Sequence, residues 1–236
     1  MFTLICFALK EEAAPFRKMA AGTAAAAPAA AVLITGIGRR NAEKSVREFL
    51  LTNSPELVLT CGFAGGLNPD LKPGDVVFEL IDRRGELHEP QTEKESGARV
   101  TRPSESSPLR KKLVAAGAKP VKFFCTDRIA TTDAEKNKLR AETGADAAEM
   151  ESEAIHAVCR ERGIPCATVR VISDTASEDL PLDFNQLAKP DQSLDYGKLA
   201  WAIARSPGKI GALLKLQKQT RFAAERLAEV LEQMCL

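Results

Sequence analysis

The chain has 236 residues, 44% of them hydrophobic and 28% charged, which excludes a disordered protein and allows one sizeable core. We therefore expect a single domain over residues 1–236. Its 33 basic and 32 acidic residues nearly cancel, so no overall positive field favours nucleic acid as a partner. Six scattered cysteines without a C-x-x-C pair are typical of reduced thiols and predict a cytoplasmic protein.

Strands and helices alternate along the first half of the sequence. Apolar runs predict strands at residues 2–8, 31–35, 57–61 and 75–81. Helices are expected at residues 41–51 and 11–19, although Pro15 limits where the latter can begin. An alanine-rich stretch at 20–31 and a polar stretch at 82–107 are both expected to be surface connections.

The same alternation continues through the second half. Strands are expected at residues 121–125, 146–148 and 166–173, and helices at 133–142 and 151–162. Residues 175–193 read as irregular, and helices at 196–204 and 209–232 form a helical extension from about residue 195. This order predicts an α/β fold with a central mixed, mostly parallel sheet flanked by helices.

Three carboxylates are expected at one edge of this sheet. Glu149 and Glu151 join a short apolar stretch to a helix, and Asp174 ends a run of valine and isoleucine. Both places lie at the carboxyl edge, where open α/β sheets bind ligands. Because Asp174 must be partly desolvated, it is either hydrogen-bonded structurally or able to hold a proton for chemistry. Together these groups suit a ligand that becomes positively charged.

Two glycine-rich segments and one glutamate pair follow strands at the same edge. Residues 62–66 (Gly-Phe-Ala-Gly-Gly) could leave main-chain donors open to a ligand or form a sharp turn. Glu11 and Glu12 could take part in chemistry or complement the dipole of the helix they open. Gly36 and Gly38 lie between a strand and a helix, as in a phosphate-binding turn.

Cofactor and metal sites are not expected. After Gly36 and Gly38, Asn41 stands where a dinucleotide fingerprint has its third glycine, which disfavours a nicotinamide site. The only two histidines, His88 and His156, are too few for a histidine-based zinc site or a Ser-His-Asp triad.

Taken in order, these segments resemble the nucleoside phosphorylase and nucleosidase superfamily, and most closely the methylthioadenosine/S-adenosylhomocysteine nucleosidases. The resemblance implies a three-layer phosphorylase-like fold. The tail instead resembles the hopanoid-associated phosphorylases, which are thought to remove adenine from adenosylhopane; it does so at residues 180–181, 189–191, 204–208 and 213–216. The superfamily resemblance rests on residues 8–12, 36–38, 62–66, 72–76, 148–152 and 169–174.

Cleavage of a purine–ribose bond passes through a positively charged ribosyl group, so it needs an acid, a nearby anion and an activated nucleophile. The resemblance implies that Asp174 protonates or hydrogen-bonds N7 of an adenine nucleoside modified at its 5′ position, while Glu12 orients and deprotonates the attacking water. Glu151 would hold the ribose hydroxyls. The remaining residues expected to bind substrate are Phe63, Ala64, Gly65, Glu149, Met150 and Ser173.

The identity of the nucleophile depends on two departures from the superfamily. Phe63 stands where a serine is general, and Thr60 stands where hexameric phosphorylases have an arginine. Since phosphate needs fixed cationic donors, we expect hydrolysis, with phosphorolysis as the alternative if Arg39 or Arg40 substitutes. A second alternative is an inactive nucleoside-binding module in which Phe63 fills the nucleophile pocket.

The resemblance also implies a homo-oligomer. Residues 82–107 lack the aromatic-rich segment that covers the 5′ group in small-substrate nucleosidases, which suits a larger substituent. The closing helix mixes basic and apolar residues, so it could touch an anionic membrane transiently or pack on the sheet with a basic outer face. These residues are Lys209, Ile210, Leu213, Leu214, Lys215, Lys218, Arg221, Phe222, Arg226 and Leu227.

Overall fold

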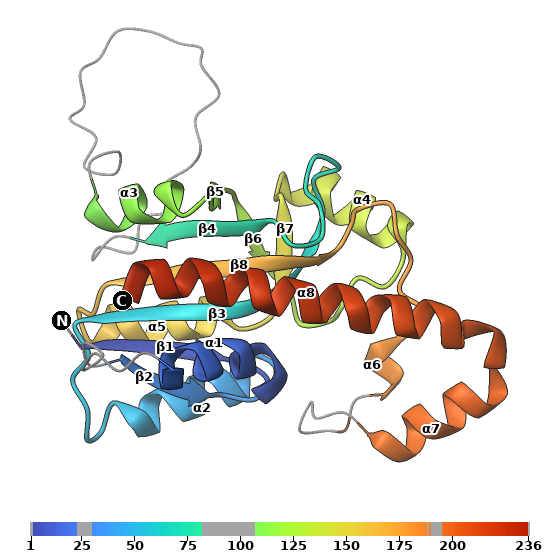
Figure 1. Ribbon diagram of the computed structural model, residues 1–236, viewed down its shortest axis with the longest axis horizontal. Coiled ribbons are helices and arrows are strands. Elements are labelled where there is room, and N and C mark those ends of the chain that lie inside the picture. The colour runs from blue at the N-terminus through green and yellow to red at the C-terminus, as the bar shows by residue number, and fades with distance from the viewer. Residues whose placement is uncertain (1, 23–29, 82–106, 188, 190–194, 236) are drawn as a thin grey trace, which may run out of the picture.

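The computed structural model describes residues 2–22, 30–81, 107–187, 189 and 195–235. Within these residues, eight strands form one sheet with helices on both of its faces (Figure 1). Surface connections were expected at 20–31 and 82–107, and residues 23–29 and 82–106 of them lie outside the described residues, as does His88. The strands are β1 (Thr3–Phe7), β2 (Ala30–Ile34), β3 (Leu57–Gly66), β4 (Val76–Ile81), β5 (Lys119–Pro120), β6 (Phe123–Cys125), β7 (Ala147–Glu149) and β8 (Cys166–Asp174).

The sheet is mixed and mostly parallel, which confirms the fold predicted from the sequence. Its main order is β2-β1-β3-β8-β4-β5. β1, β2, β3 and β8 run parallel, whereas β4 runs antiparallel to β8. β7 pairs antiparallel with the end of β3 and parallel with β6. The carboxyl ends of β1, β3 and β8 therefore meet at one edge.

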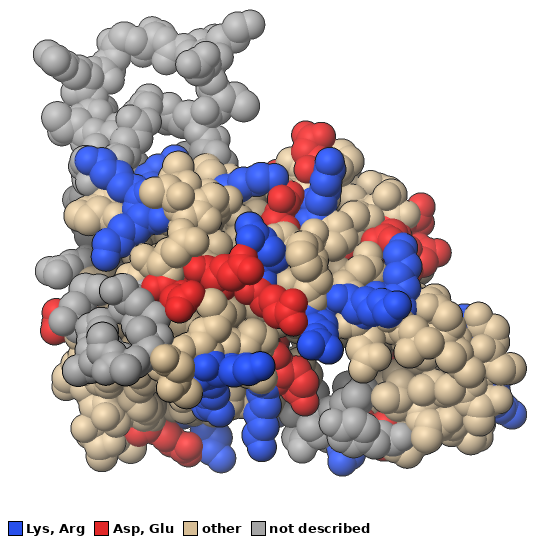
Figure 2. Space-filling view, viewed as in Figure 1, with Lys and Arg blue, Asp and Glu red and all other residues tan. Residues whose placement is uncertain are grey.

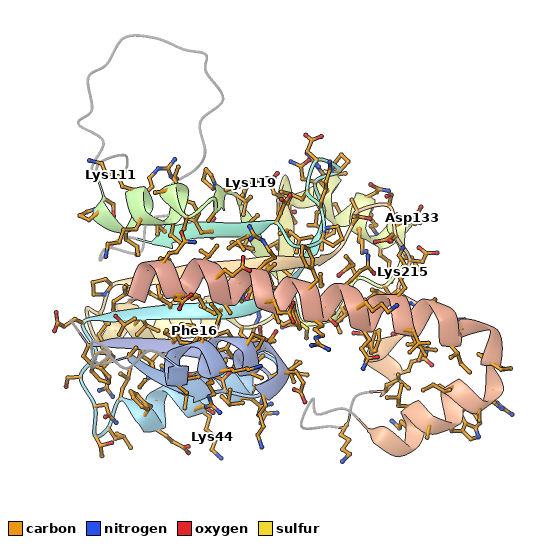
Figure 3. All side chains as sticks on the ribbon, viewed as in Figure 1. Phe16, Lys44, Lys111, Lys119, Asp133 and Lys215 are labelled. Atoms are coloured by element: carbon orange, nitrogen blue, oxygen red, sulfur yellow. The ribbon has the colours of Figure 1, made fainter. Side chains whose placement is uncertain are left out.

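Helices pack on each face according to the alternation of side chains along the strands. In β1, Ile5 and Phe7 join one buried cluster with residues of α1 (Lys10–Gly22) and α8 (Ile210–Cys235). Leu4 joins the cluster on the opposite face with α2 (Arg39–Phe49) and α5 (Ser152–Glu161). Figure 3 shows Phe16 between α1 and the sheet, while Lys44 of α2 points outward.

Other helices surround the edge of the sheet. α4 (Asp133–Thr143) begins with a capping box in which Thr132 and Glu135 satisfy each other's backbone N–H groups, and it ends at Gly144. α7 and the beginning of α8 form the end of the molecule farthest from the N-terminus (Figure 1). The remaining elements are α3 (Pro108–Ala115), α6 (Phe184–Leu187), α7 (Tyr196–Arg205) and the 3-10 turn η1 (Pro207–Lys209).

The structure corrects several boundaries. The strand expected at 57–61 is longer than expected, because β3 continues to Gly66 by pairing with β8 and β7, with a register shift between Ala64 and Gly65. This pairing excludes the sharp turn that was one of the two alternatives for residues 62–66. The strand expected at 121–125 is shortened to β6 (Phe123–Cys125), and β5 (Lys119–Pro120) and α3 were not expected. α6 interrupts the stretch expected to be irregular, and α1 holds Pro15 in its interior.

Candidate active site

A cavity of about 270 Å³ opens at the carboxyl ends of β1, β3, β7 and β8. Leu216 and Thr220 of α8 also line it, so the C-terminal helix closes part of the wall. Every residue to which the resemblance gives a role in catalysis or substrate binding lines this cavity, whereas Glu11 lines a separate hollow. These residues are Glu12, Phe63, Ala64, Gly65, Glu149, Met150, Glu151, Ser173 and Asp174.

Asp174, the last residue of β8, is buried beside two hydrogen-bond donors. Its Oδ1 accepts a hydrogen bond from Ser173 Oγ at 2.6 Å, and its Oδ2 lies 2.6 Å from Lys136 Nζ. The carboxylate lies over Gly65, where an added Cβ would stand 3.6 Å from Oδ2. At that distance a Cβ would make an ordinary van der Waals contact, so Asp174 lies close over the backbone of Gly65 at the base of the cavity.

Lys136 is a functional candidate that the sequence analysis did not single out. Its side chain is 1% exposed, and Nζ also donates to the carbonyls of Thr175 and Glu178, both at 2.7 Å. One signal was available: Lys136 precedes Leu139 by three residues and therefore lies on the inner face of α4. A lysine on that face must be compensated by acceptors.

Arg170, in the middle of β8, is the second residue without an assigned role. Its side chain is 1% exposed in a strand that is buried throughout. Nη2 lies 2.6 Å from Glu149 Oε2 and 3.2 Å from Glu151 Oε2, and it donates to Thr60 Oγ1 at 3.0 Å. A charge inside an apolar strand is itself a signal, because burial of an unpaired guanidinium is prohibitively costly.

Glu149 is held entirely by hydrogen bonds within the protein. Its Oε2 accepts from the backbone N–H groups of Glu151 and Ser152 as well as from Arg170, and its Oε1 accepts from Ser152 Oγ at 2.6 Å. Burial favours the protonated form, but Arg170 and Ser152 outweigh it and keep the pKa of Glu149 below its usual value. Its carboxylate thus anchors Arg170 and the start of α5.

Glu151 connects Arg170 with the glycine turn after β2. Its Oε1 accepts a hydrogen bond from the N–H of Gly38 at 2.9 Å. Gly38 has a φ of 85°, a conformation that glycine adopts without strain. Burial raises the pKa of Glu151, and Arg170 opposes that rise. The turn that superficially resembles a dinucleotide site therefore serves to position a carboxylate.

Glu12 is buried near Arg170, and two backbone N–H groups hold its carboxylate. Its Oε1 accepts from the N–H of Phe63 and its Oε2 from the N–H of Leu9, both at 2.9 Å. Burial raises its pKa to about 7, while Arg170 and the N–H of Phe63 lower it. A carboxyl group with a pKa near neutrality can accept a proton during turnover at physiological pH.

Gly62 makes this arrangement possible. It has a φ of +143°, and an added Cβ would lie 2.7 Å from both Arg170 Nη1 and Glu12 Oε1. Both contacts are shorter than van der Waals separation. Any larger residue would therefore push apart the two charged side chains.

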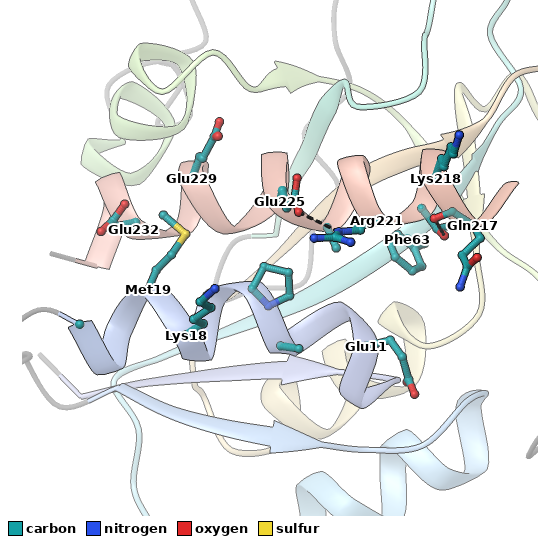
Figure 4. A pocket seen from close by; sticks show the side chains of 15 residues that line it. Glu11, Lys18, Met19, Phe63, Gln217, Lys218, Arg221, Glu225, Glu229 and Glu232 are labelled. Carbon is teal, nitrogen blue, oxygen red and sulfur yellow. Dashed lines mark hydrogen bonds and ion pairs between the residues drawn. The ribbon is translucent and has the colours of Figure 1, made fainter. Parts of the chain in front are cut away.

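Phe63 separates the cavity from a second hollow between α1 and α8. This hollow has a volume of about 1310 Å³, and Figure 4 shows Phe63 toward one end of it, below Lys218 and beside Gln217 of α8. The ring is half-buried and packs against the core cluster beneath α1 and α8. Phe63 thus contributes its backbone N–H to Glu12 and its ring to the wall between the two spaces.

Cations are scarce around the cavity. Among the described residues that line it, Lys136 is the one cation. Arg39 instead pairs with Asp127 at 3.1 Å and with Glu153 at 2.7 Å, and neither Arg39 nor Arg40 lines the cavity. Across the described ranges, no three His, Cys, Asp or Glu side chains are grouped to hold a metal ion.

Comparisons with known proteins agree with this geometry. The 5′-methylthioadenosine/S-adenosylhomocysteine nucleosidase of Shewanella halifaxensis is 30% identical over 169 residues, which span 66% of this chain and 73% of the relative. The corresponding enzyme of Marinomonas sp. is 28% identical, over 67% of this chain and 73% of the relative.

Solved structures show the same fold. The futalosine hydrolase of Helicobacter pylori strain 26695 superimposes with a TM-score of 0.65 at 21% identity, covering 99% of this chain and 97% of that one. The Neisseria meningitidis nucleosidase in complex with methylthio-immucillin-A gives a TM-score of 0.64 at 18% identity, with the same coverage. The family model of the phosphorylase superfamily matches residues 8–193, which contain every cavity residue except those of α8. The chain therefore belongs to the phosphorylase superfamily.

Proposed function

We propose that this protein hydrolyses the N-glycosidic bond of an adenine nucleoside modified at its 5′ position. The observation that carries the proposal is one cavity that holds Asp174 beside two donors and Glu12 with a pKa of about 7. The names of the nucleosidase relatives support this reaction class. The proposal requires neither a metal nor a redox cofactor.

Each residue would have one task in this reaction. As the bond between C1′ and N9 breaks, its electron pair passes to the purine, and Asp174 gives its proton to N7. Glu151 accepts hydrogen bonds from ribose hydroxyls and stabilises the positive ribosyl group. Glu12 takes a proton from the water that attacks C1′. The products are free adenine and the 5′-modified ribose.

The cavity favours water over phosphate as the nucleophile. A phosphate dianion would need fixed cationic donors. The only cation among the described lining residues, Lys136, already has three acceptors within hydrogen-bonding distance. Phosphorolysis, including that of adenosylhopane, stays the alternative.

A substrate panel tests the proposal. The protein is incubated with 5′-deoxy-5′-methylthioadenosine, S-adenosylhomocysteine, inosine and a hydrophobic 5′-alkyl adenosine, with and without phosphate, and free base is measured. Adenine release without phosphate supports hydrolysis, whereas release only with phosphate would establish phosphorolysis. Binding without turnover of any nucleoside would leave an inactive binding module.

We further propose that the end formed by α7 and the start of α8 touches an anionic membrane surface transiently. Residues 196–224 contain six basic residues and no acidic one. Trp201, Ile210 and Leu214 are 59%, 44% and 54% exposed. Figure 2 shows this end as mostly uncharged surface with scattered basic side chains. Basic and apolar residues together bind anionic interfaces.

No helix in the described part of the chain has both the length and the apolar character needed to span a bilayer. The proposed contact is therefore peripheral. The proposal places the protein in the cytoplasm, which the buried thiols of Cys6, Cys159 and Cys166 support, because none of them is in a disulfide. We also propose that the protein forms a homo-oligomer, and the molar mass from light scattering of the purified protein tests this.

A further inference from the structure

Lys136 is buried as completely as any charged residue in the described structure, and its environment specifies one orientation. An ammonium group has three N–H donors. Asp174 Oδ2 lies 2.6 Å from Nζ, and the carbonyls of Thr175 and Glu178 each lie 2.7 Å away. Each donor therefore has one acceptor, which offsets the cost of removing the charge from water.

The two carbonyls belong to the turn that follows β8. They fix the position of Nζ independently of Asp174, so the third N–H must point at Oδ2. Oδ1 is held differently, by the hydroxyl of Ser173 at 2.6 Å. That hydroxyl has a second acceptor within reach, the carbonyl of Ala64 at 3.3 Å. Oδ1 can thus be released to a ligand by rotation of one hydroxyl, whereas Oδ2 cannot.

The other cations near the cavity pair with carboxylates other than Asp174. Arg170 already faces Glu149 and Glu151, with Glu12 close by, and Lys215 pairs with the side chain of Glu178 on the outer side of the turn. Figure 3 shows Lys215 on α8 beside this turn. Lys136 is therefore the cation in contact with Asp174.

We propose that Lys136 is the positioning residue of the general acid: it fixes Asp174 so that Oδ1 gives its proton to the leaving base. As that proton passes from Oδ1 to N7, a negative charge develops on the carboxylate, 2.6 Å from Nζ. The ion pair is then stronger in the transition state than in the ground state, and only such interactions accelerate the reaction. The inference rests on the proposed nucleosidase function.

The test compares two leaving groups that differ in their need for a proton. Adenine leaves with a proton on N7, whereas 4-nitrophenolate leaves from 4-nitrophenyl β-D-ribofuranoside without one. In Lys136→Met, we expect kcat for the nucleoside to fall about 100-fold, the range seen when one oriented donor is lost, with KM changed far less. Hydrolysis of the nitrophenyl riboside should fall less than threefold.

Lys138→Met is the matched control, because Lys138 lies on the same helix with a side chain that is 75% exposed. It should leave both rates unchanged. If Lys136→Met does not fold, as judged by thermal unfolding, Lys136→Gln replaces it, with the same expected fall in the ratio of the two rates.

One result would overturn the inference: an unchanged ratio of the two rates. It would arise if neither rate falls, or if both fall by the same factor, which would mean that Lys136 only maintains the fold. The wild-type protein is assayed first on both substrates. If it releases no base from any nucleoside, the proposed function itself fails, and the inference fails with it. These outcomes are distinguishable because only the last involves the unaltered protein.

Discussion

Two buried cations organise the site at the level of single residues. Arg170 holds the carboxylates of Glu149 and Glu151, and Lys136 holds Asp174. Removing one member of a buried ion pair leaves its partner uncompensated, which costs about 3–5 kcal/mol. The site therefore depends on complete pairs rather than on isolated catalytic groups.

Replacement of Glu12 by glutamine should lower activity and raise stability. The pKa of Glu12 rises from 4.5 to about 7 on folding, so the folded state binds its proton more tightly than the unfolded state. Stability is therefore lost as pH rises from the unfolded to the folded pKa. Glu12→Gln has no carboxyl group to ionise and does not lose this stability. The difference in unfolding free energy between Glu12→Gln and the wild type should therefore grow in favour of the variant as pH rises from 5 to 8.

The pH dependence of kcat/KM on the acid side tests the predicted effect of Glu12 on activity. Since Glu12 must be ionised to accept a proton from water, wild-type kcat/KM should rise through about pH 7. Glu11→Gln is the control, because Glu11 is exposed on the same helix. A variant at Glu12 with an unchanged pH profile would refute the assignment of the base.

At the level of elements, Gly62 makes β3 compatible with the site. We expect Gly62→Ala to destabilise the protein by about 1–3 kcal/mol through overpacking and to reduce activity strongly, because the new Cβ would meet Arg170 and Glu12. Denaturant unfolding and nucleoside turnover measure both effects. Gly117→Ala is the control: its φ of +86° is also strained, but no atom lies within 4 Å of the added Cβ. Equal loss of activity in both variants would contradict this explanation.

The same elements show what the sequence could and could not predict. The runs around Leu59 and Val169 are apolar enough to predict β3 and β8, and the carboxylates at their ends predict the cavity. The extension of β3 through Gly66 was missed, because it depends on pairing with β7, some eighty residues later along the chain. Lys136 was missed for a similar reason: its three acceptors come from the end of β8 and the turn after it.

At the level of the whole molecule, α7 and the start of α8 are expected to bind anionic vesicles. Sedimentation with vesicles of phosphatidylglycerol and phosphatidylcholine should recover the wild-type protein, and recovery should fall with rising salt as surface charges are screened. Trp201→Ser with Leu214→Ser should reduce recovery severalfold without changing nucleoside turnover. Val114→Ser, at another exposed apolar residue, is the control. Recovery that does not depend on these residues, or their burial in a dimer, would reject the membrane contact.

The central claim is that Asp174 supplies the proton to the leaving adenine. The most direct measurement is release of adenine from a 5′-alkylthio adenosine, without phosphate, by the wild type, Asp174→Asn and the exposed control Asp70→Asn. Loss of a general acid typically costs about 10²- to 10⁴-fold in rate, so Asp174→Asn should be nearly inactive while Asp70→Asn matches the wild type. Adenine release by Asp174→Asn at the wild-type rate would contradict the account.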